Sequence, residues 1–278
     1  KIQEFVREWT AAEGHLQPEI KRFIDAWLEG GLHDWCISRD APYFGFEIPG
    51  EEGKFFYVWL DAPIGYIASS DNWAQRTGQP TAADAIWKDG KGRVEHVIGK
   101  DIIYFHCLFW PAMLHAAGLT TPSKVHVHGM LTVNGTKMSK SRGTFIRARK
   151  FLEFLQPEYL RYYYAAKIGP SPEDIDLSAE DFVNRVNAEL VNTFANLVSR
   201  TANFVVSKLD GKTGDFKPED EEHLAFVRTK TKEAEACYRA FDLAGAVRCA
   251  VEVANLGNKL FQDAEPWKAV KTDPEAAR

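Results

Sequence analysis

Hydrophobic and polar positions follow two different periods along this chain, and the change of period divides it. Up to residue 177, short apolar runs rich in β-forming residues stand between helical stretches. From Ser178 onward, apolar residues recur three and four positions apart, which is the spacing of helices packed on one face. The pattern predicts an α/β protein whose second part is an all-α bundle.

Two helices are expected in residues 2–32, and Gly30-Gly31 ends the second. The near-continuous apolar run 54–60 predicts a buried parallel strand. Asp61 is expected to cap the helix that follows it. The other elements expected before residue 178 are strands at 93–99 and 125–131, helices at 64–76, 102–117, 147–155 and 157–167, and an extended piece at 174–177.

The remaining helices are expected at 178–209, 219–242 and 243–262. Ser178 and Asp181 resemble a capping box at the start of the first. Glu265-Pro266 is expected to stop the last helix and to present Trp267 beyond it.

Composition describes an ordinary soluble protein with one local peculiarity. The 278 residues are 45% hydrophobic and 26% charged, with a net charge of −5. This balance argues against a general coat for nucleic acid. Residues 134–168 nevertheless carry eight Lys and Arg against two Glu, so a basic stretch lies inside an acidic protein.

The four cysteines are scattered, at positions 36, 107, 237 and 249, with no C-x-x-C pair. Neither a disulfide framework nor a metal knuckle is indicated, so no metal site is expected in this chain. Free thiols fit a reducing cytoplasm, which is the expected location. No apolar run approaches 18 residues, so no membrane span is expected.

The stretch that carries the chemistry is Lys137-Met138-Ser139-Lys140-Ser141. It follows a predicted strand and the turn dipeptide Asn134-Gly135, so it is expected in a polar loop. Two lysines three residues apart suit a polyphosphate, because each is a compact charge on a flexible stem. A solvated surface loop is the alternative interpretation. The five residues match the KMSKS signature of class I aminoacyl-tRNA synthetases, and this match favours binding of a polyphosphate over a plain surface loop.

Three further stretches join this signature: residues 34–40 (DWCISRD), residues 59–66 (WLDAPIGY), and Gly99-Lys100-Asp101 continuing through His106 to Trp110-Pro111. Together the four resemble bacterial methionyl-tRNA synthetases of class I. The resemblance runs from Leu32 to about Trp267. The family has Asp where Cys36 stands here, and no known role depends on that position.

The resemblance implies roles that the residues alone leave open. Without it, Arg39 with Asp40 reads as a surface ion pair and His106 as a core residue. With it, Arg39 assists substrate activation, Gly99 and Asp101 hold the ATP ribose, and Lys137 and Lys140 act on the ATP phosphates. The implied methionine pocket is Trp59, Ala62, Pro63, Tyr66, Ile102 and His106, and the implied readers of a CAU anticodon are Asn196, Arg200 and Trp267.

The resemblance also implies a division of the chain. Residues 1–31 would end a connective insert, 32–132 would be the C-terminal half of a Rossmann-like catalytic domain, 133–177 would hold the KMSKS loop and a stem-contact region, and 178–278 would be a truncated anticodon-binding bundle. The family's first half-sheet and its zinc-binding insert are expected before Lys1. ATP with Mg²⁺, methionine and tRNA(Met) are therefore the expected ligands, zinc is expected only outside this chain, and the chain is expected to be inactive alone.

Two other functions stay open at this point. One is a different class I synthetase, for leucine, isoleucine, valine or cysteine, or a nucleotidyltransferase on the same sheet. The run Trp59-Leu60-Asp61-Ala62-Pro63 argues against these. The other is a non-enzymatic module that binds tRNA. The sequence does not indicate an oligomeric state.

Overall fold

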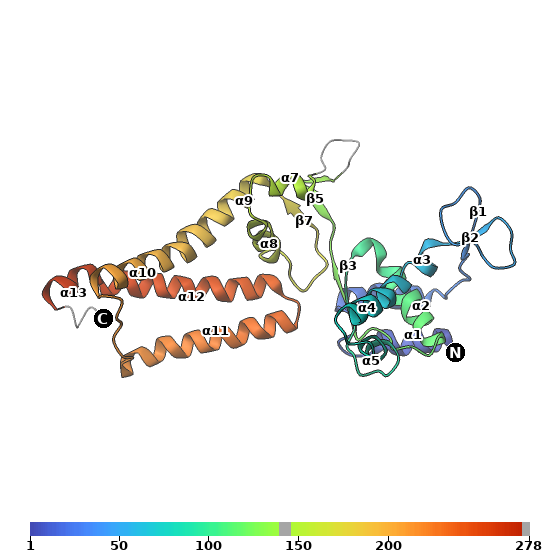
Figure 1. The fold of residues 1–278 in the computed structure, drawn as a ribbon, viewed down its shortest axis with the longest axis horizontal. Coiled ribbons are helices and arrows are strands. Elements are labelled where there is room, and N and C mark those ends of the chain that lie inside the picture. The colour runs from blue at the N-terminus through green and yellow to red at the C-terminus, as the bar shows by residue number, and fades with distance from the viewer. Residues whose placement is uncertain (139–145, 274–278) are drawn as a thin grey trace. The chain divides into compact units, whose positions relative to one another are not determined.

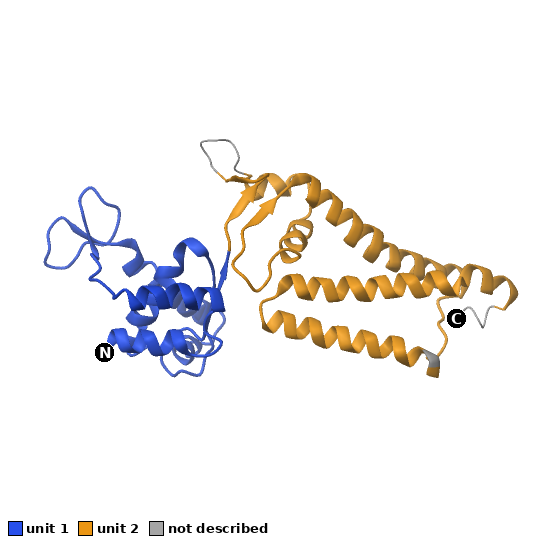
Figure 2. Cartoon of the chain, turned by 180° about the vertical axis from the view of Figure 1, so that it is seen from behind, with its two compact units in different colours: residues 1–128 blue, residues 129–278 orange. Residues whose placement is uncertain are grey.

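The computed structural model describes residues 1–138 and 146–273, and the chain forms two compact units, residues 1–128 and 129–278 (Figure 2). The first unit mixes helices with short strands, and the second passes from a small sheet into long helices (Figure 1). The predicted order, α/β first and helical afterwards, is confirmed. Within the described residues, no helix has the length and apolar character that crossing a membrane requires.

Unit 1 contains a parallel pair of strands that packs against helices. The strand β3 pairs with β4 in register from Glu95 opposite Lys124 to Gly99 opposite His128. The elements of this unit are α1 (Ile2–Ala11), α2 (Pro18–Glu29), β1 (Ser38–Asp40), β2 (Lys54–Phe56), α3 (Val58–Asp61), α4 (Ile64–Arg76), α5 (Ala82–Trp87), β3 (Glu95–Gly99), η1 (Lys100–Ile102), η2 (Phe105–Phe109), α6 (Trp110–Ala116) and β4 (Lys124–His128).

The core of unit 1 forms where the first two helices meet the β3–β4 pair. The apolar stripes that predicted these helices are the buried faces, with Val6 and Trp9 from α1 and Ile24 from α2. Val125 and Val127 of β4 pack in the same cluster. Burying a side chain of this size stabilises the fold by roughly 1.5–3 kcal/mol. The core therefore fixes β3, and with it the residues at its carboxyl end.

The expected buried strand at 54–60 is wrong. The chain forms β2 at Lys54–Phe56, pairs it antiparallel with β1, and turns into the short helix α3. A short apolar run cannot distinguish a strand from a helix segment, and here it contains both. Asp61 consequently lies inside α3 and does not cap α4, whose N-cap is Pro63.

Unit 2 begins with a three-stranded sheet in the order β6–β5–β7 and continues as a helical bundle. Helices α11 and α12 pack along each other (Figure 1). The elements are β5 (Leu131–Val133), β6 (Thr136–Lys137), α7 (Ala148–Leu152), α8 (Pro157–Ala165), β7 (Ile175–Leu177), α9 (Ala179–Arg185), η3 (Val186–Ala195), α10 (Asn196–Lys208), η4 (Pro218–Asp220), α11 (Glu221–Arg239), α12 (Leu243–Ala264) and α13 (Pro266–Thr272).

Several local predictions for unit 2 are confirmed. The Ser178 hydroxyl accepts a hydrogen bond from the Asp181 amide at 3.3 Å, which caps α9. The chain turns at Asn134-Gly135, where both residues have positive φ, and then forms β6. Helix α12 ends before Pro266, although a further helix, α13, starts there and contains Trp267.

A carboxylate on β7 fixes the hairpin that leads toward the KMSKS stretch. Asp176 Oδ1 accepts hydrogen bonds from the Thr132 hydroxyl at 2.6 Å and from the Gly135 amide at 2.7 Å. These bonds hold the pKa of Asp176 below its usual range, so the group is ionised at neutral pH. The turn before Lys137 is thus tied to a neighbouring strand.

We expect Asp176→Ala to destabilise unit 2 by about 1–2 kcal/mol, because it removes the acceptor of two hydrogen bonds. Asp176→Asn is the matched control, since its amide oxygen keeps one acceptor at the same place. Urea unfolding of the 278-residue chain, followed by circular dichroism, measures both variants. Equal stability of Asp176→Ala and the wild type would show that the turn does not depend on this carboxylate.

Candidate functional site

The implied methionine pocket has a polar tip made by Tyr66 and His106. The Tyr66 hydroxyl lies 2.8 Å from His106 Nε2, and His106 Nδ1 lies 3.0 Å from the carbonyl oxygen of Ile102. A carbonyl can only accept, so Nδ1 carries the proton and Nε2 accepts from Tyr66. Helix α4 supplies Tyr66, and the π-helix η2 supplies His106.

Burial keeps both groups of this tip neutral. His106 is fully buried, and burial lowers the pKa of its imidazole while the Ile102 carbonyl partly opposes that effect. Burial raises the pKa of the Tyr66 phenol. A neutral phenol and a neutral imidazole form a weakly polar surface, which does not demand a charged ligand.

Aromatic rings form the wall beside this tip. Trp59 stacks on Phe105 with ring centroids 4.4 Å apart, and its ring meets His106 edge-on at 5.5 Å. The structure therefore brings Trp59, Tyr66, Ile102 and His106 together, as the resemblance implied. Pro63 is buried, and Ala62 is exposed at the end of α3.

Arg39 joins the same aromatic cluster from β1. Its guanidinium lies 4.1 Å from the centroid of the Tyr57 ring, and Nη1 donates to the Ser38 carbonyl at 2.8 Å. The Tyr57 ring in turn lies 6.2 Å from Phe105. The surface pair with Asp40 is wrong, because Asp40 forms its ion pair with Lys54 across the β1–β2 hairpin.

The end of β3 explains the glycine at position 99. A Cβ on Gly99 would lie 2.7 Å from Asp101 Oδ1, so the exposed Asp101 carboxylate folds back over the strand end. A larger residue at 99 would force this carboxylate away. Gly99 and Asp101 thus lie side by side at the carboxyl end of a parallel strand, where ligands of open α/β sheets bind.

Of the two signature lysines, Lys137 is exposed in β6, and Lys140 lies outside the described residues, which omit 139–145. Lys137 belongs to unit 2, whereas the groups around Tyr66 belong to unit 1.

The implied anticodon readers lie on helices of unit 2. Arg200 of α10 donates to Gln262 Oε1 at 3.0 Å, and its guanidinium lies 6.0 Å from the centroid of the Trp267 ring. Trp267 also packs against Phe261, with centroids 5.8 Å apart. Asn196 is exposed at the start of α10, one turn before Arg200. The structure joins Arg200 and Trp267 and leaves Asn196 on the surface.

A buried polar residue that sequence reasoning missed lies against the Tyr66–His106 tip. His96 of β3 is 7% exposed and accepts a hydrogen bond at Nε2 from the Trp110 indole at 3.1 Å. Burial, with a smaller effect from His106, lowers the pKa of His96 to about 4. The only available signal was a histidine at an inward-facing position of a predicted strand.

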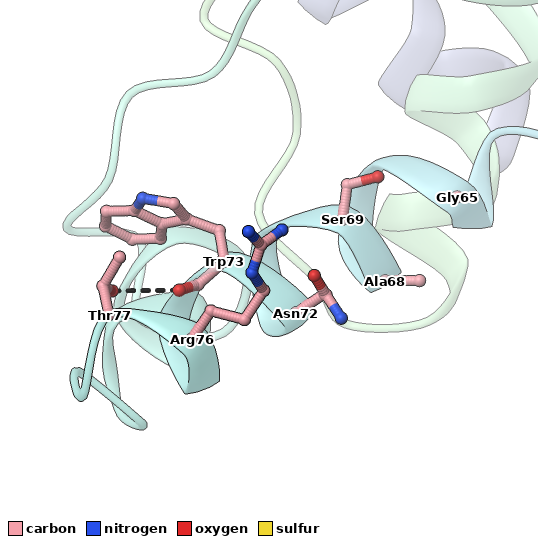
Figure 3. Close-up of a pocket in the computed structure, with 7 residues that line it drawn as sticks. All are labelled: Gly65, Ala68, Ser69, Asn72, Trp73, Arg76 and Thr77. Carbon is pink, nitrogen blue, oxygen red and sulfur yellow. Dashed lines mark hydrogen bonds between the residues drawn. The ribbon is translucent and has the colours of Figure 1, made fainter.

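A hollow of about 650 Å³ lies along α4, apart from the Tyr66–His106 tip (Figure 3). All its lining residues come from α4 and the residue after it, so the hollow has a single wall and no facing chemistry. It does not include Tyr66 or His106. Its lining residues are Gly65, Ala68, Ser69, Asn72, Trp73, Arg76 and Thr77.

The pKa of His96 predicts how stability depends on pH. An unfolded histidine titrates near 6.5, so between about pH 6.5 and pH 4 the unfolded chain binds a proton that the folded chain excludes. Stability present at pH 7.5 is therefore lost on acidification, by about 2 kcal/mol at pH 5 from this residue. Urea unfolding at pH 7.5 and pH 5 measures the loss of unfolding free energy on acidification. This loss should be about 2 kcal/mol smaller in His96→Gln than in the wild type. The same loss in both proteins would contradict the shift, and His33→Gln, at an exposed histidine of the same unit, is the control.

Two kinds of comparison with known proteins agree on the family. The family model described as "tRNA synthetases class I (M)" matches residues 1–202 of this chain. Among solved structures, Mycobacterium tuberculosis methionyl-tRNA synthetase bound by methionyl-adenylate superposes with a TM-score of 0.85 at 28% sequence identity, over 99% of this chain and 54% of that one.

The ligand-free form of the same enzyme superposes with a TM-score of 0.81 at 26% identity, over 99% of this chain and 53% of that one. This chain thus spans about half the length of the chains it matches. The α/β part followed by a helical bundle fits the matched fold throughout. The chain belongs to the family of class I tRNA synthetases that the model labelled (M) describes.

Proposed function

We propose that this chain carries the methionine pocket and the anticodon-reading bundle of an enzyme that joins methionine to tRNA(Met) with ATP. The observation that carries the proposal is the Tyr66–His106 tip set into an aromatic wall. The similarity to a methionyl-tRNA synthetase bound by methionyl-adenylate supports it.

The pocket suits a thioether for a physical reason. Sulfur is polarizable and only weakly accepts hydrogen bonds, so it favours aromatic walls with few polar groups. Trp59 and Phe105 supply the wall, and the neutral Tyr66–His106 pair supplies the polar group. A charged or strongly hydrogen-bonding amino acid would leave its side chain without a matching partner here.

The reaction needs positioning and charge stabilisation more than covalent help from the protein. The methionine carboxylate attacks the α-phosphorus of ATP, pyrophosphate leaves, and the adenylate then passes to the 3′ ribose of tRNA. Gly99 and Asp101 would hold the ATP ribose. Lys137 and Lys140 would stabilise charge on the leaving pyrophosphate, and Arg39 would assist activation.

Mg²⁺ would arrive with the ATP phosphates, and zinc stays predicted only outside this chain. Among the residues that the structure describes, no group of three His, Cys, Asp or Glu side chains gathers as a metal site. The four-part division of the chain and the cytoplasmic location also stay predictions.

Arg200 and Trp267 would read an exposed anticodon base, by stacking and by hydrogen bonds to its edge. Residues 178–278 carry 14 Lys and Arg against 17 Asp and Glu, so a diffuse phosphate field does not explain binding there. Recognition would depend on a few direct contacts. Asn196 is the third proposed contact.

The deciding experiment is a screen of amino acids by ATP–pyrophosphate exchange, using the protein at its natural length. Methionine should stimulate the exchange most. A greater stimulation by leucine, isoleucine, valine or cysteine would contradict the proposal, and tRNA binding without any exchange would favour a non-enzymatic module.

Trp59→Ala should raise the KM for methionine about tenfold with a smaller change in kcat, because a stacked aromatic wall contributes on the order of 1 kcal/mol beyond its buried area. The matched control is Trp73→Ala, since Trp73 is 47% exposed on α4 and does not contact the Tyr66–His106 tip. Steady-state exchange kinetics on both variants measures the effect. Unchanged methionine binding in Trp59→Ala would assign this ring to packing alone.

Trp267→Ala should reduce aminoacylation of a CAU-anticodon tRNA about tenfold or more while leaving methionine adenylation near normal, because a stacked base contributes roughly 1–3 kcal/mol. Trp267 also packs on Phe261, so the melting temperature is measured on the same preparation. The control is Phe216→Ala, which removes another aromatic ring of unit 2, one that is 79% exposed. Equal loss of both reactions would mean that Trp267 only supports the bundle.

A further inference from the structure

His96 is a buried polar residue for which the proposed reaction has no direct use. It lies on β3, whose buried positions face the core, and only 7% of its surface is exposed. A polar ring in such a place costs free energy unless it forms a hydrogen bond. Its partner and its neighbours therefore indicate why a histidine is there.

The protonation of His96 follows from its partner. An indole N–H can only donate, so His96 Nε2 accepts the bond from Trp110 and the proton of the neutral ring is on Nδ1. Trp110 is itself 2% exposed, so its N–H has no access to solvent in place of this acceptor. The pair holds the His96 ring in one orientation.

The oriented ring lies against both members of the polar tip. Its centroid is 4.8 Å from that of Tyr66 and 5.4 Å from that of His106. The Trp110 ring also lies 6.1 Å from Tyr66. His96 and Trp110 thus form the surface behind the phenol ring. His96 comes from β3, and Trp110 starts α6, which directly continues the segment η2 that carries His106.

The direction of the Tyr66 hydroxyl depends on this backing. The phenol must place its oxygen 2.8 Å from His106 Nε2 in order to donate to it. Tyr66 is 37% exposed, so its ring has space on the outer side and is supported on the inner side by His96. A smaller or displaced side chain at position 96 would let the phenol tilt and weaken that bond.

We propose that His96 is a positioning residue of the methionine pocket, which holds the Tyr66–His106 pair in the geometry that selects a thioether side chain. This inference rests on the proposed function. His96 acts through the two tip residues, and its own ring is held by Trp110.

The test compares His96→Leu with His96→Gln in the protein at its natural length. Leucine removes the acceptor of the Trp110 indole, whereas the glutamine amide oxygen can still accept it. Pyrophosphate-exchange kinetics is measured with methionine and with norleucine, which has a methylene in place of the sulfur. His96→Leu should raise the KM for methionine about tenfold with kcat within about threefold, and it should lower the preference for methionine over norleucine. His96→Gln should recover at least half of that preference.

A second pair of variants tests the mechanism. Trp110→Phe removes the donor that orients His96, so it should lower the same preference, and the double variant with His96→Leu should lose less than the two single effects combined. His126→Gln, at a histidine that is 3% exposed on the neighbouring strand, should leave the preference unchanged. Melting temperatures of all variants are recorded.

The outcomes separate the inference from the function on which it rests. If His96→Leu folds and keeps the wild-type KM and preference, His96 does not position the pocket. If it loses kcat equally for both amino acids together with thermal stability, its role is only structural, and the inference is also wrong. A wild-type protein without methionine-dependent exchange would overturn the proposed function itself.

Discussion

The hydrogen bond between His106 Nδ1 and the Ile102 carbonyl determines which atoms donate and accept in the proposed methionine pocket. Its length is 3.0 Å, and it fixes one tautomer, so the other ring nitrogen must accept from Tyr66. The backbone carbonyl of Ile102 thereby decides that the Tyr66 hydroxyl donates its proton to His106. Because burial disfavours the charged imidazole by lowering its pKa, the arrangement holds throughout the neutral pH range.

The same strand end serves the other proposed ligand. Gly99 ends β3 and Asp101 lies two residues later, and the β3–β4 pair packs in an apolar core with α1 and α2. The ribose would therefore be positioned at the end of a rigid strand, which leads through η1 into the segment that carries His106. Sites built on such elements keep their geometry better than sites built on loops alone.

Periodicity was sufficient for most of the fold. The first two helices follow apolar stripes, and most of each stripe is buried, as at Val6 and Ile24. The bundle helices were predicted in the same way, although Phe194 and Val198 of their expected stripe are 47% and 56% exposed. It failed at 54–60, where a run without alternation holds both β2 and α3. Adjacency in the sequence failed for Arg39 and Asp40, since the partner of Asp40 is a lysine fourteen residues away that only the hairpin brings near.

The candidate site shows the same limit more sharply. Tyr66 and His106 were assigned to the candidate site through the resemblance of motifs. His96 was not, because the alternation of a strand cannot distinguish a buried histidine that acts on a site from one that only packs. The proposed role of His96 depends on its hydrogen bond with the indole of Trp110 and on its contact with the phenol ring of Tyr66. Such contacts arise only when α4, β3 and α6 pack together. Motifs can thus suggest residues for direct ligand contact, whereas a residue proposed to orient them becomes visible only in three dimensions.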